Sequence, residues 1–166
     1  MLTAGQPFTS KLGAMAHSET ARAIWLVGPL LADLWSRYAG SINLLAGVEF
    51  AADPADDLTG FVDFILSRSP QTDFVTPPVL VAFEAKQDSI PDGLGQCVAA
   101  MVGAQRFNRR AGEPDGPVYG CVTTGSVWKF LRLDAAGLVE DMADYTQADV
   151  PRLLGILVHI VGPPPG

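Results

Sequence analysis

The sequence predicts an α/β fold in which helices flank one mixed β-sheet of four to five strands. Two segments with the apolar composition of buried strands, 60–66 and 79–86, lie in the middle of the chain. An amphipathic helical pattern precedes this pair of strands, and a second helical pattern follows it directly. Two further strand patterns and a closing helix complete the order, so that helices can cover the faces of one sheet.

The first predicted helix begins after Ser18, a favourable N-cap residue, and ends by Gly40. Pro29 lies inside the helical pattern and predicts a bend or an interruption there. Residues 42–50 predict a first strand, which an acidic turn at 53–57 ends. The apolar residues of the helix recur at helical spacing: Ile24, Val27, Leu30, Leu31, Leu34 and Trp35.

The second half of the chain continues the same alternation. The two central strands are joined by a loop at 67–78, which is long enough to be functional or mobile. A second helix is expected over 92–110. Strand patterns at 118–123 and 127–133 predict a hairpin, and a proline at the start of 151–160 suits the first turn of a closing helix.

Length and composition indicate one domain with a sizeable core, since 48% of the 166 residues are hydrophobic and 17% are charged. We expect a flexible arm at 1–16, a single domain at 17–162 and a proline-rich tail at 163–166. The chain lacks a secretory signal pattern and an apolar run that could span a bilayer. The sequence therefore predicts a cytoplasmic protein that does not interact with membranes.

The charge balance limits the possible partners. With 18 acidic and 11 basic residues the net charge is −7, so an overall basic surface for nucleic acid is absent. A polyanionic partner must therefore be bound locally or through a cation. Two cysteines and two histidines are too few for a zinc site of the His/Cys type, which this composition almost excludes.

Charged residues within the two apolar central strands are the most informative feature of the sequence. Asp63 lies among apolar residues, and Glu84 and Lys86 share one face of the next strand because side chains alternate. If the strands are neighbours, two carboxylates about 4 Å apart repel by about 4 kcal/mol at an effective dielectric constant of about 20. Lys86 offsets one of the two charges. The remaining alternatives are a raised carboxylate pKa or a bound divalent cation.

Oxygen ligands with open coordination positions suit Mg²⁺ or Mn²⁺. The chemistry that such a site implies is hydrolysis at a phosphoryl centre, where the metal ion activates water and neutralises charge on the ester oxygens.

Asp63, followed on the next strand by Glu84-Ala85-Lys86, resembles the PD-(D/E)XK nuclease superfamily. The restriction-endonuclease-like core of that superfamily runs αβββαβ. Val62 stands where the name of the family has proline. The resemblance covers about residues 17–133. Other segments resemble one uncharacterised bacterial branch: Glu19-Thr20-Ala21-Arg22, 58–64, Gly95-Gln96, Asn108 and 124–130.

The resemblance implies a role for each of these side chains. Asp63 and Glu84 would bind the metal ion, with the main-chain carbonyl of Ala85 as a third ligand. Glu19 would complete the acidic cluster, directly or through water. Lys86 would position the attacking water or help to deprotonate it. Two nearby carboxylates oppose the fall in pKa that a base requires, so we favour positioning and electrostatic stabilisation. Gln96 would donate or accept a hydrogen bond near the lysine or the substrate.

Simpler alternatives exist for several of these residues. Glu84 and Lys86 could form an ion pair at the end of the strand. Glu19 is favoured in a first helical turn by the helix dipole, and it could pair with Arg22. Gln96 could be an ordinary helix-surface residue.

Arginines provide candidate contacts to the phosphates that flank the scissile one. The alternative is that the cluster at the end of the second helix complements the helix dipole. The four candidates are Arg68, Arg106, Arg109 and Arg110.

The sequence thus predicts a nuclease that depends on Mg²⁺ or Mn²⁺ and hydrolyses phosphodiester bonds, with DNA favoured over RNA. One alternative is a non-catalytic member of the same fold that binds nucleic acid or protein. Another is an α/β domain with a structural salt bridge, in which Asp63 lies apart from Glu84. Because one domain holds one such site, cutting both strands of a duplex would need a homodimer or two encounters.

Overall fold

The structure, a computed structural model, describes residues 17–38, 40–53 and 58–162. The expected arm at 1–16, the tail at 163–166 and most of the acidic turn lie outside the described residues. The helices are a composite first helix made of α2 (Glu19–Arg22), the π-helical turn η1 (Ala23–Val27) and α3 (Gly28–Arg37), followed by α4 (Pro91–Arg110) and α5 (Val150–Val161). The strands are β1 (Asn43–Asp53), β2 (Leu58–Ser67), β3 (Val79–Ala85), β4 (Val118–Thr123), β5 (Val127–Asp134), β6 (Gly137–Glu140) and β7 (Tyr145–Thr146).

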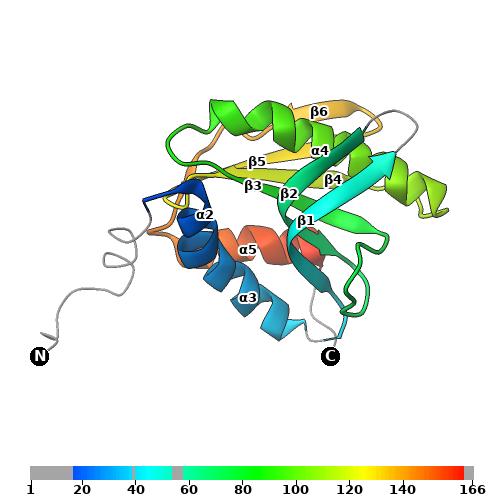
Figure 1. The fold of residues 1–166 in the computed structure, drawn as a ribbon, viewed down its shortest axis with the longest axis horizontal. Helices are drawn as coiled ribbons and strands as arrows, with labels where there is room; N and C mark the ends of the chain where they lie inside the picture. The colour runs from blue at the N-terminus through cyan, green and yellow to red at the C-terminus, as the bar shows by residue number, and fades with distance from the viewer. Residues whose placement is uncertain (1–16, 39, 54–57, 163–166) are drawn as a thin grey trace, which may run out of the picture.

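All of these strands belong to one mixed sheet, in which β3 and β4 are parallel and the other pairs are antiparallel. The strand order is β1-β2-β3-β4-β5-β6, with β7 paired to β5 (Figure 1). The α/β class is confirmed. The predicted count of four to five strands is wrong, because the sheet has seven. The additional strands β6 and β7 are short, so they lack the long alternating pattern by which strands are recognised.

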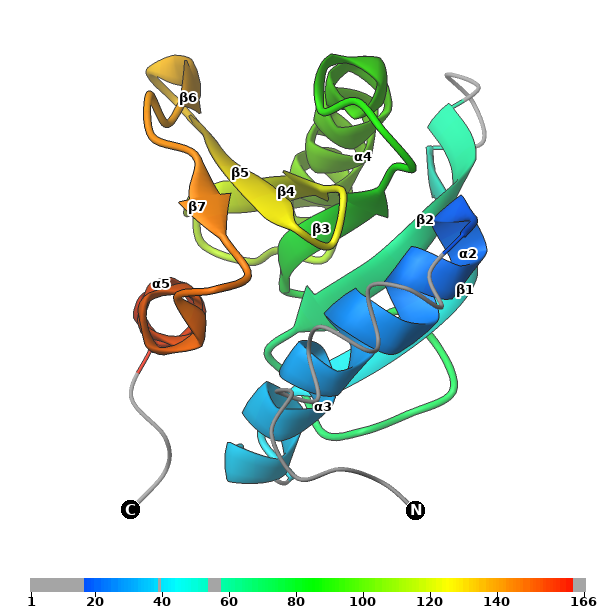
Figure 2. The ribbon, with the colours of Figure 1, turned by 90° about the vertical axis from the view of Figure 1, so that its left-hand side faces the viewer.

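Helices cover both faces of the sheet (Figure 2). On one face α4 packs against a cluster that includes Ala82, Val118 and Val122, with Cys97 and Met101 from the helix. The first helix and α5 cover the other face, where the apolar side of each helix meets a second cluster. That cluster includes Val27, Leu31, Leu34, Phe83, Trp128, Leu153 and Leu157. Alternate residues of the strands therefore pack into two separate hydrophobic cores, one on each face of the sheet.

The first helix begins as predicted, because the Ser18 side chain accepts a hydrogen bond from the Ala21 amide at 3.1 Å. The predicted interruption takes the form of the π-helical turn η1, which lies directly before Pro29 in the first turn of α3. Proline has no amide hydrogen and its ring crowds the preceding turn, so a widened turn at this point accommodates it.

A side chain in the last turn of α4 ties this helix to the start of β3. The side chain of Asn108 accepts a hydrogen bond from the Val79 amide at 2.7 Å and donates one to the Val79 carbonyl at 2.9 Å. This pair of bonds joins the last turn of α4 to the first residue of β3. In the described part of the chain, no helix combines the length and apolar character that crossing a membrane requires.

Close packing of α4 on β4 predicts the effect of one substitution. In Gly120→Ala the new methyl group would lie 2.7 Å from the Cys97 Sγ atom and would also collide with Met101. Overpacking of this kind costs about 1–3 kcal/mol of the free energy of unfolding. Urea denaturation measures that loss.

The matched control is Gly155→Ala, since Gly155 lies in α5 with nothing within 4 Å of an added Cβ. Alanine is the better helix former, so this variant is expected to gain about 0.5–1 kcal/mol. Equal stability of the two variants would contradict the packing described for Gly120.

Candidate active site

The candidate site lies where β2 and β3 stop pairing. Phe64 and Phe83 form the pair at that end of the β2–β3 ladder, and Asp63 and Glu84 are the adjacent residues on the two strands. Figure 2 shows α2 and α4 on either side of this end of β3. Asp63 and Glu84 are therefore the first residues beyond the paired segment on each strand.

The Asp63 carboxylate is held against the backbone next to Glu84. Asp63 Oδ2 accepts a hydrogen bond from the Ala85 amide at 2.7 Å, which holds the Asp63 side chain beside the backbone of Glu84. The Glu84 side chain is only 1% exposed. Its Oε1 atom is buried and has no hydrogen-bond partner among the described residues. The hypothesis that Asp63 lies apart from Glu84 is therefore wrong.

Burial and mutual repulsion disfavour the ionised forms of both acids. Burial, followed by the charge of Asp63, raises the pKa of Glu84 from 4.5 to about 8. Burial also raises the pKa of Asp63, although the Ala85 amide acts in the opposite direction. Lys86 lowers both values without cancelling the shift of either acid. Ionising both carboxylates at neutral pH therefore calls for additional positive charge.

The Lys86 ammonium group is held by three oxygen atoms. Its Nζ atom lies 3.0 Å from Gln96 Oε1, 3.4 Å from Glu19 Oε1 and 4.0 Å from Glu84 Oε2. The Gln96 amide in turn donates to the Phe61 carbonyl at 3.3 Å. Two of these contacts are hydrogen bonds, to Gln96 and Glu19, and the third is an ion pair with Glu84; together they hold the lysine end group beside the acids.

A close approach that the sequence analysis missed allows Lys86 to take this position. Gly93 lies in the first turn of α4, and a Cβ added there would come within 2.6 Å of Val122 Cγ1 and 3.0 Å of Lys86 Cγ. Only glycine lets the start of the helix pass so near the lysine. The sequence signal was a glycine in a first helical turn, directly after Pro91 and Asp92.

The structure thus brings Asp63, Glu84, Lys86, Gln96 and Glu19 to one end of β3. Glu19 contacts the lysine rather than Arg22, so the alternative Glu19–Arg22 ion pair is not what the structure contains. Across the described residues, no three His, Cys, Asp or Glu side chains are grouped closely enough to enclose a metal ion. A direct bond from Glu19 to a metal, and one from the Ala85 carbonyl, stay predictions.

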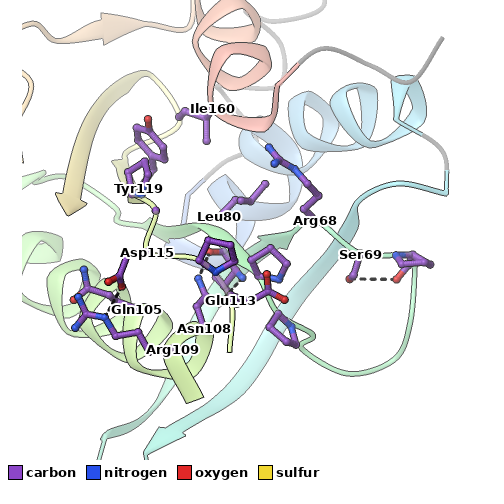
Figure 3. A pocket seen from close by; sticks show the side chains of 17 residues that line it. Arg68, Ser69, Leu80, Gln105, Asn108, Arg109, Glu113, Asp115, Tyr119 and Ile160 are labelled. Atoms are coloured by element: carbon purple, nitrogen blue, oxygen red, sulfur yellow. Dashed lines mark hydrogen bonds and ion pairs between the residues drawn. The ribbon is translucent and has the colours of Figure 1, made fainter. Parts of the chain in front are cut away.

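A cavity of about 740 Å³ lies elsewhere (Figure 3). It is formed around the first residues of β3 and β4, at the opposite end of these parallel strands from Glu84. At about 3.3 Å per residue, the length of β3 separates the two ends by roughly 20 Å. Arg68 and Arg109 line this cavity.

Both arginines of the cavity have partners within the protein. Arg68 donates to the Val161 carbonyl at 2.5 Å, and Arg109 pairs with Asp115 at 2.9 Å. Arg106 and Arg110 lie in the last turns of α4, at the end of the helix away from Gln96. None of the four predicted phosphate contacts is therefore next to the acidic pair, and their contact with nucleic acid stays a prediction.

Comparison with known proteins identified no relative of this chain. No family model, curated protein or solved structure matches the chain. Membership of the PD-(D/E)XK superfamily is therefore a proposal that depends on the residues of the site.

The buried acid predicts how stability depends on pH. The unfolded chain releases the Glu84 proton near pH 4.5 and the folded chain near pH 8, so the folded state holds more protons between these values. The free energy of unfolding is expected to fall by a few kcal/mol as the pH rises through this window. Urea denaturation at a series of pH values measures the fall.

Glu84→Gln removes the titrating group and keeps nearly the same shape. The free energy of unfolding of this variant should therefore decrease much less with pH, and at pH 8 it should exceed that of the wild type. The control Asp33→Asn removes an exposed carboxylate of α3 and should keep the wild-type profile. Parallel profiles for wild type and Glu84→Gln would be inconsistent with a buried Glu84 of raised pKa.

Proposed function

We propose that this protein is a metal-dependent nuclease of the PD-(D/E)XK type, with DNA as the favoured substrate. The observation that carries the proposal is the convergence of Asp63, Glu84 and Lys86 at one strand end, where a buried Glu84 oxygen has no partner. The order of elements from α2 to β4 supports a restriction-endonuclease-like core, because it follows the pattern αβββαβ.

The donor groups fit Mg²⁺ or Mn²⁺. Both ions prefer carboxylate and carbonyl oxygens, and Mg²⁺ commonly binds one or two carboxylates while keeping several waters. Asp63 and Glu84 would therefore suffice as acidic ligands, with the Ala85 carbonyl as the third protein ligand. The unpartnered Glu84 oxygen and the raised pKa of both acids support a cation at this position. When bound, the ion would activate water and neutralise charge on the phosphate.

The other side chains orient the substrate and stabilise charge. Lys86 presents its ammonium group beside the acids, where it can hydrogen-bond the attacking water or an oxygen of the scissile phosphate. Gln96 and Glu19 keep that group in place from opposite sides, one from α4 and one from α2. This arrangement favours positioning and electrostatic stabilisation over removal of a proton by the lysine.

The net charge of −7 is compatible with a substrate that is held locally. A protein without a broad basic surface depends on a few cationic groups and on the metal ion to bind a polyanion. Binding should therefore be weak in the absence of divalent cations and at high salt. Cleavage of both strands of a duplex would require a second copy of the chain or a second encounter.

A divalent cation should stabilise the folded protein. Mg²⁺ at 100 times its dissociation constant adds about 2.7 kcal/mol if the unfolded chain does not bind it. The melting temperature at pH 8 is therefore expected to rise with Mg²⁺ or Mn²⁺ in the wild type. Glu84→Gln should show little of this rise, whereas Asp33→Asn should show all of it. Equal responses of the three proteins would mean that Glu84 does not bind the cation.

Catalysis is tested with short single-stranded and duplex DNA in Mg²⁺. Asp63→Asn and Lys86→Ala are each expected to lower the cleavage rate at least a hundredfold, the size of effect that loss of an electrostatic group produces. Asp33→Asn is the carboxylate control, and circular dichroism verifies that each variant folds. Cation binding without cleavage by the wild type would favour the non-catalytic alternative. Cleavage that persists in both site variants would refute the assignment of these residues.

A further inference from the structure

A second cationic side chain lies at the same edge of the sheet and has no role in the proposal above. Arg22 ends α2, three residues after Glu19, so that the two residues share one face of the helix. Its Nη1 atom donates to the Thr124 carbonyl at 2.9 Å. The preceding carbonyl, that of Thr123, accepts a hydrogen bond from the Lys86 amide at 2.8 Å. The hydrogen bond to Thr124 therefore places the guanidinium close to the backbone of Lys86.

The hydrogen bonding of Arg22 is incomplete. Its Nε atom is buried and has no partner, and no described carboxylate forms an ion pair with the guanidinium. An arginine is always charged, and leaving part of a buried charged group unpaired costs free energy. The charge is delocalised over the whole planar group, so an anion at its accessible side would compensate it.

The point to which Arg22 is attached is rigid. The turn after β4 is held by a hydrogen bond from the Gly125 amide to Thr123 Oγ1 at 2.8 Å. Gly125 has a φ of +81°, and an added Cβ would lie 2.5 Å from Leu26 Cδ1, which shows how closely the turn packs against the first helix. A guanidinium fixed in this way loses little freedom when an anion binds.

Arg22 is also set apart from the acidic pair. It donates to the Thr124 carbonyl, and among the described residues neither Asp63 nor Glu84 forms an ion pair with it. Its charge is therefore available to an external anion rather than used within the acidic cluster.

We propose that Arg22 binds the phosphate next to the scissile one, and so determines how a nucleic acid strand lies across the site. The inference rests on the proposed nuclease function. Arginine suits this task because its planar donors match two oxygens of a phosphate diester. A contact of this type is made equally in the ground state and the transition state, so it lowers KM and leaves kcat unchanged.

The test compares Arg22→Gln with the wild type on a DNA oligonucleotide in Mg²⁺. Glutamine keeps a donor for the Thr124 carbonyl and removes the charge. We expect KM to rise about tenfold, with kcat within about twofold of the wild type. The slope of log affinity against log salt should fall in magnitude by about 0.7–0.9, the contribution of one phosphate contact. The control Arg37→Gln, at an exposed arginine of α3 paired with Asp33, should change neither quantity.

If Arg22→Gln has the same KM and the same salt slope as the wild type, this inference is overturned while the nuclease proposal stays intact. Absence of Mg²⁺-dependent cleavage by the wild type would instead reject the nuclease proposal itself. If Arg22→Gln does not fold, Arg22→Lys decides, since lysine keeps the charge and one donor but not the planar pair. A raised KM with an unchanged salt slope in that variant supports the inference, and an unchanged KM overturns it.

Discussion

Burial of the Glu84 carboxylate beside Asp63 is the constraint on which the rest of the site depends. Apolar residues on both faces of β3 hold the strand in the sheet up to Glu84. The β2–β3 ladder ends one residue earlier, and the Ala85 amide holds the Asp63 carboxylate next to Glu84. A buried pair of like charges is unfavourable, and one ammonium group 4.0 Å away compensates it only in part. Groups kept in such an environment are characteristic of functional sites, where polar groups are positioned before the substrate arrives.

The topology explains why this edge of the sheet collects the functional side chains. β3 and β4 are parallel, so their carboxyl ends and the start of α4 meet at one place. Gly93 lets α4 begin almost in contact with Lys86, and Asn108 fastens the other end of the helix to the start of β3. The composite first helix reaches the same edge from the opposite face of the sheet and contributes Glu19 and Arg22. Residues distant in sequence thus surround one strand end.

The sequence predicted those features that depend on local pattern. Alternation within two apolar strands predicted that Asp63 lies near Glu84 if the strands are neighbours. Helical spacing located the first two helices, and Pro151 marked the start of the closing helix. The sequence did not predict β6 and β7, whose few residues show too short a pattern. Contacts between distant residues, such as that of Arg22 with Thr124, leave no signal in spacing. The glycine at position 93 marks a close approach, but the sequence does not show that Lys86 is the residue approached. Grouping the arginines by charge alone ignored the length of α4, which places Arg106, Arg109 and Arg110 at the end of the helix away from the acids.

Unpaired polar atoms distinguish the end of β3 where Asp63, Glu84, Glu19 and Arg22 lie, here called the acidic edge, from the cavity at the other end of the strands. In the cavity, Arg109 is neutralised by Asp115, and Asn108 forms two bonds with the backbone. Among the described residues, two buried side-chain atoms have no partner, the acceptor Glu84 Oε1 and the donor Arg22 Nε. Both belong to the acidic edge. Once Glu84 is ionised, a divalent cation would satisfy its unpaired acceptor, and a phosphate diester at the exposed part of the Arg22 guanidinium would balance that positive charge.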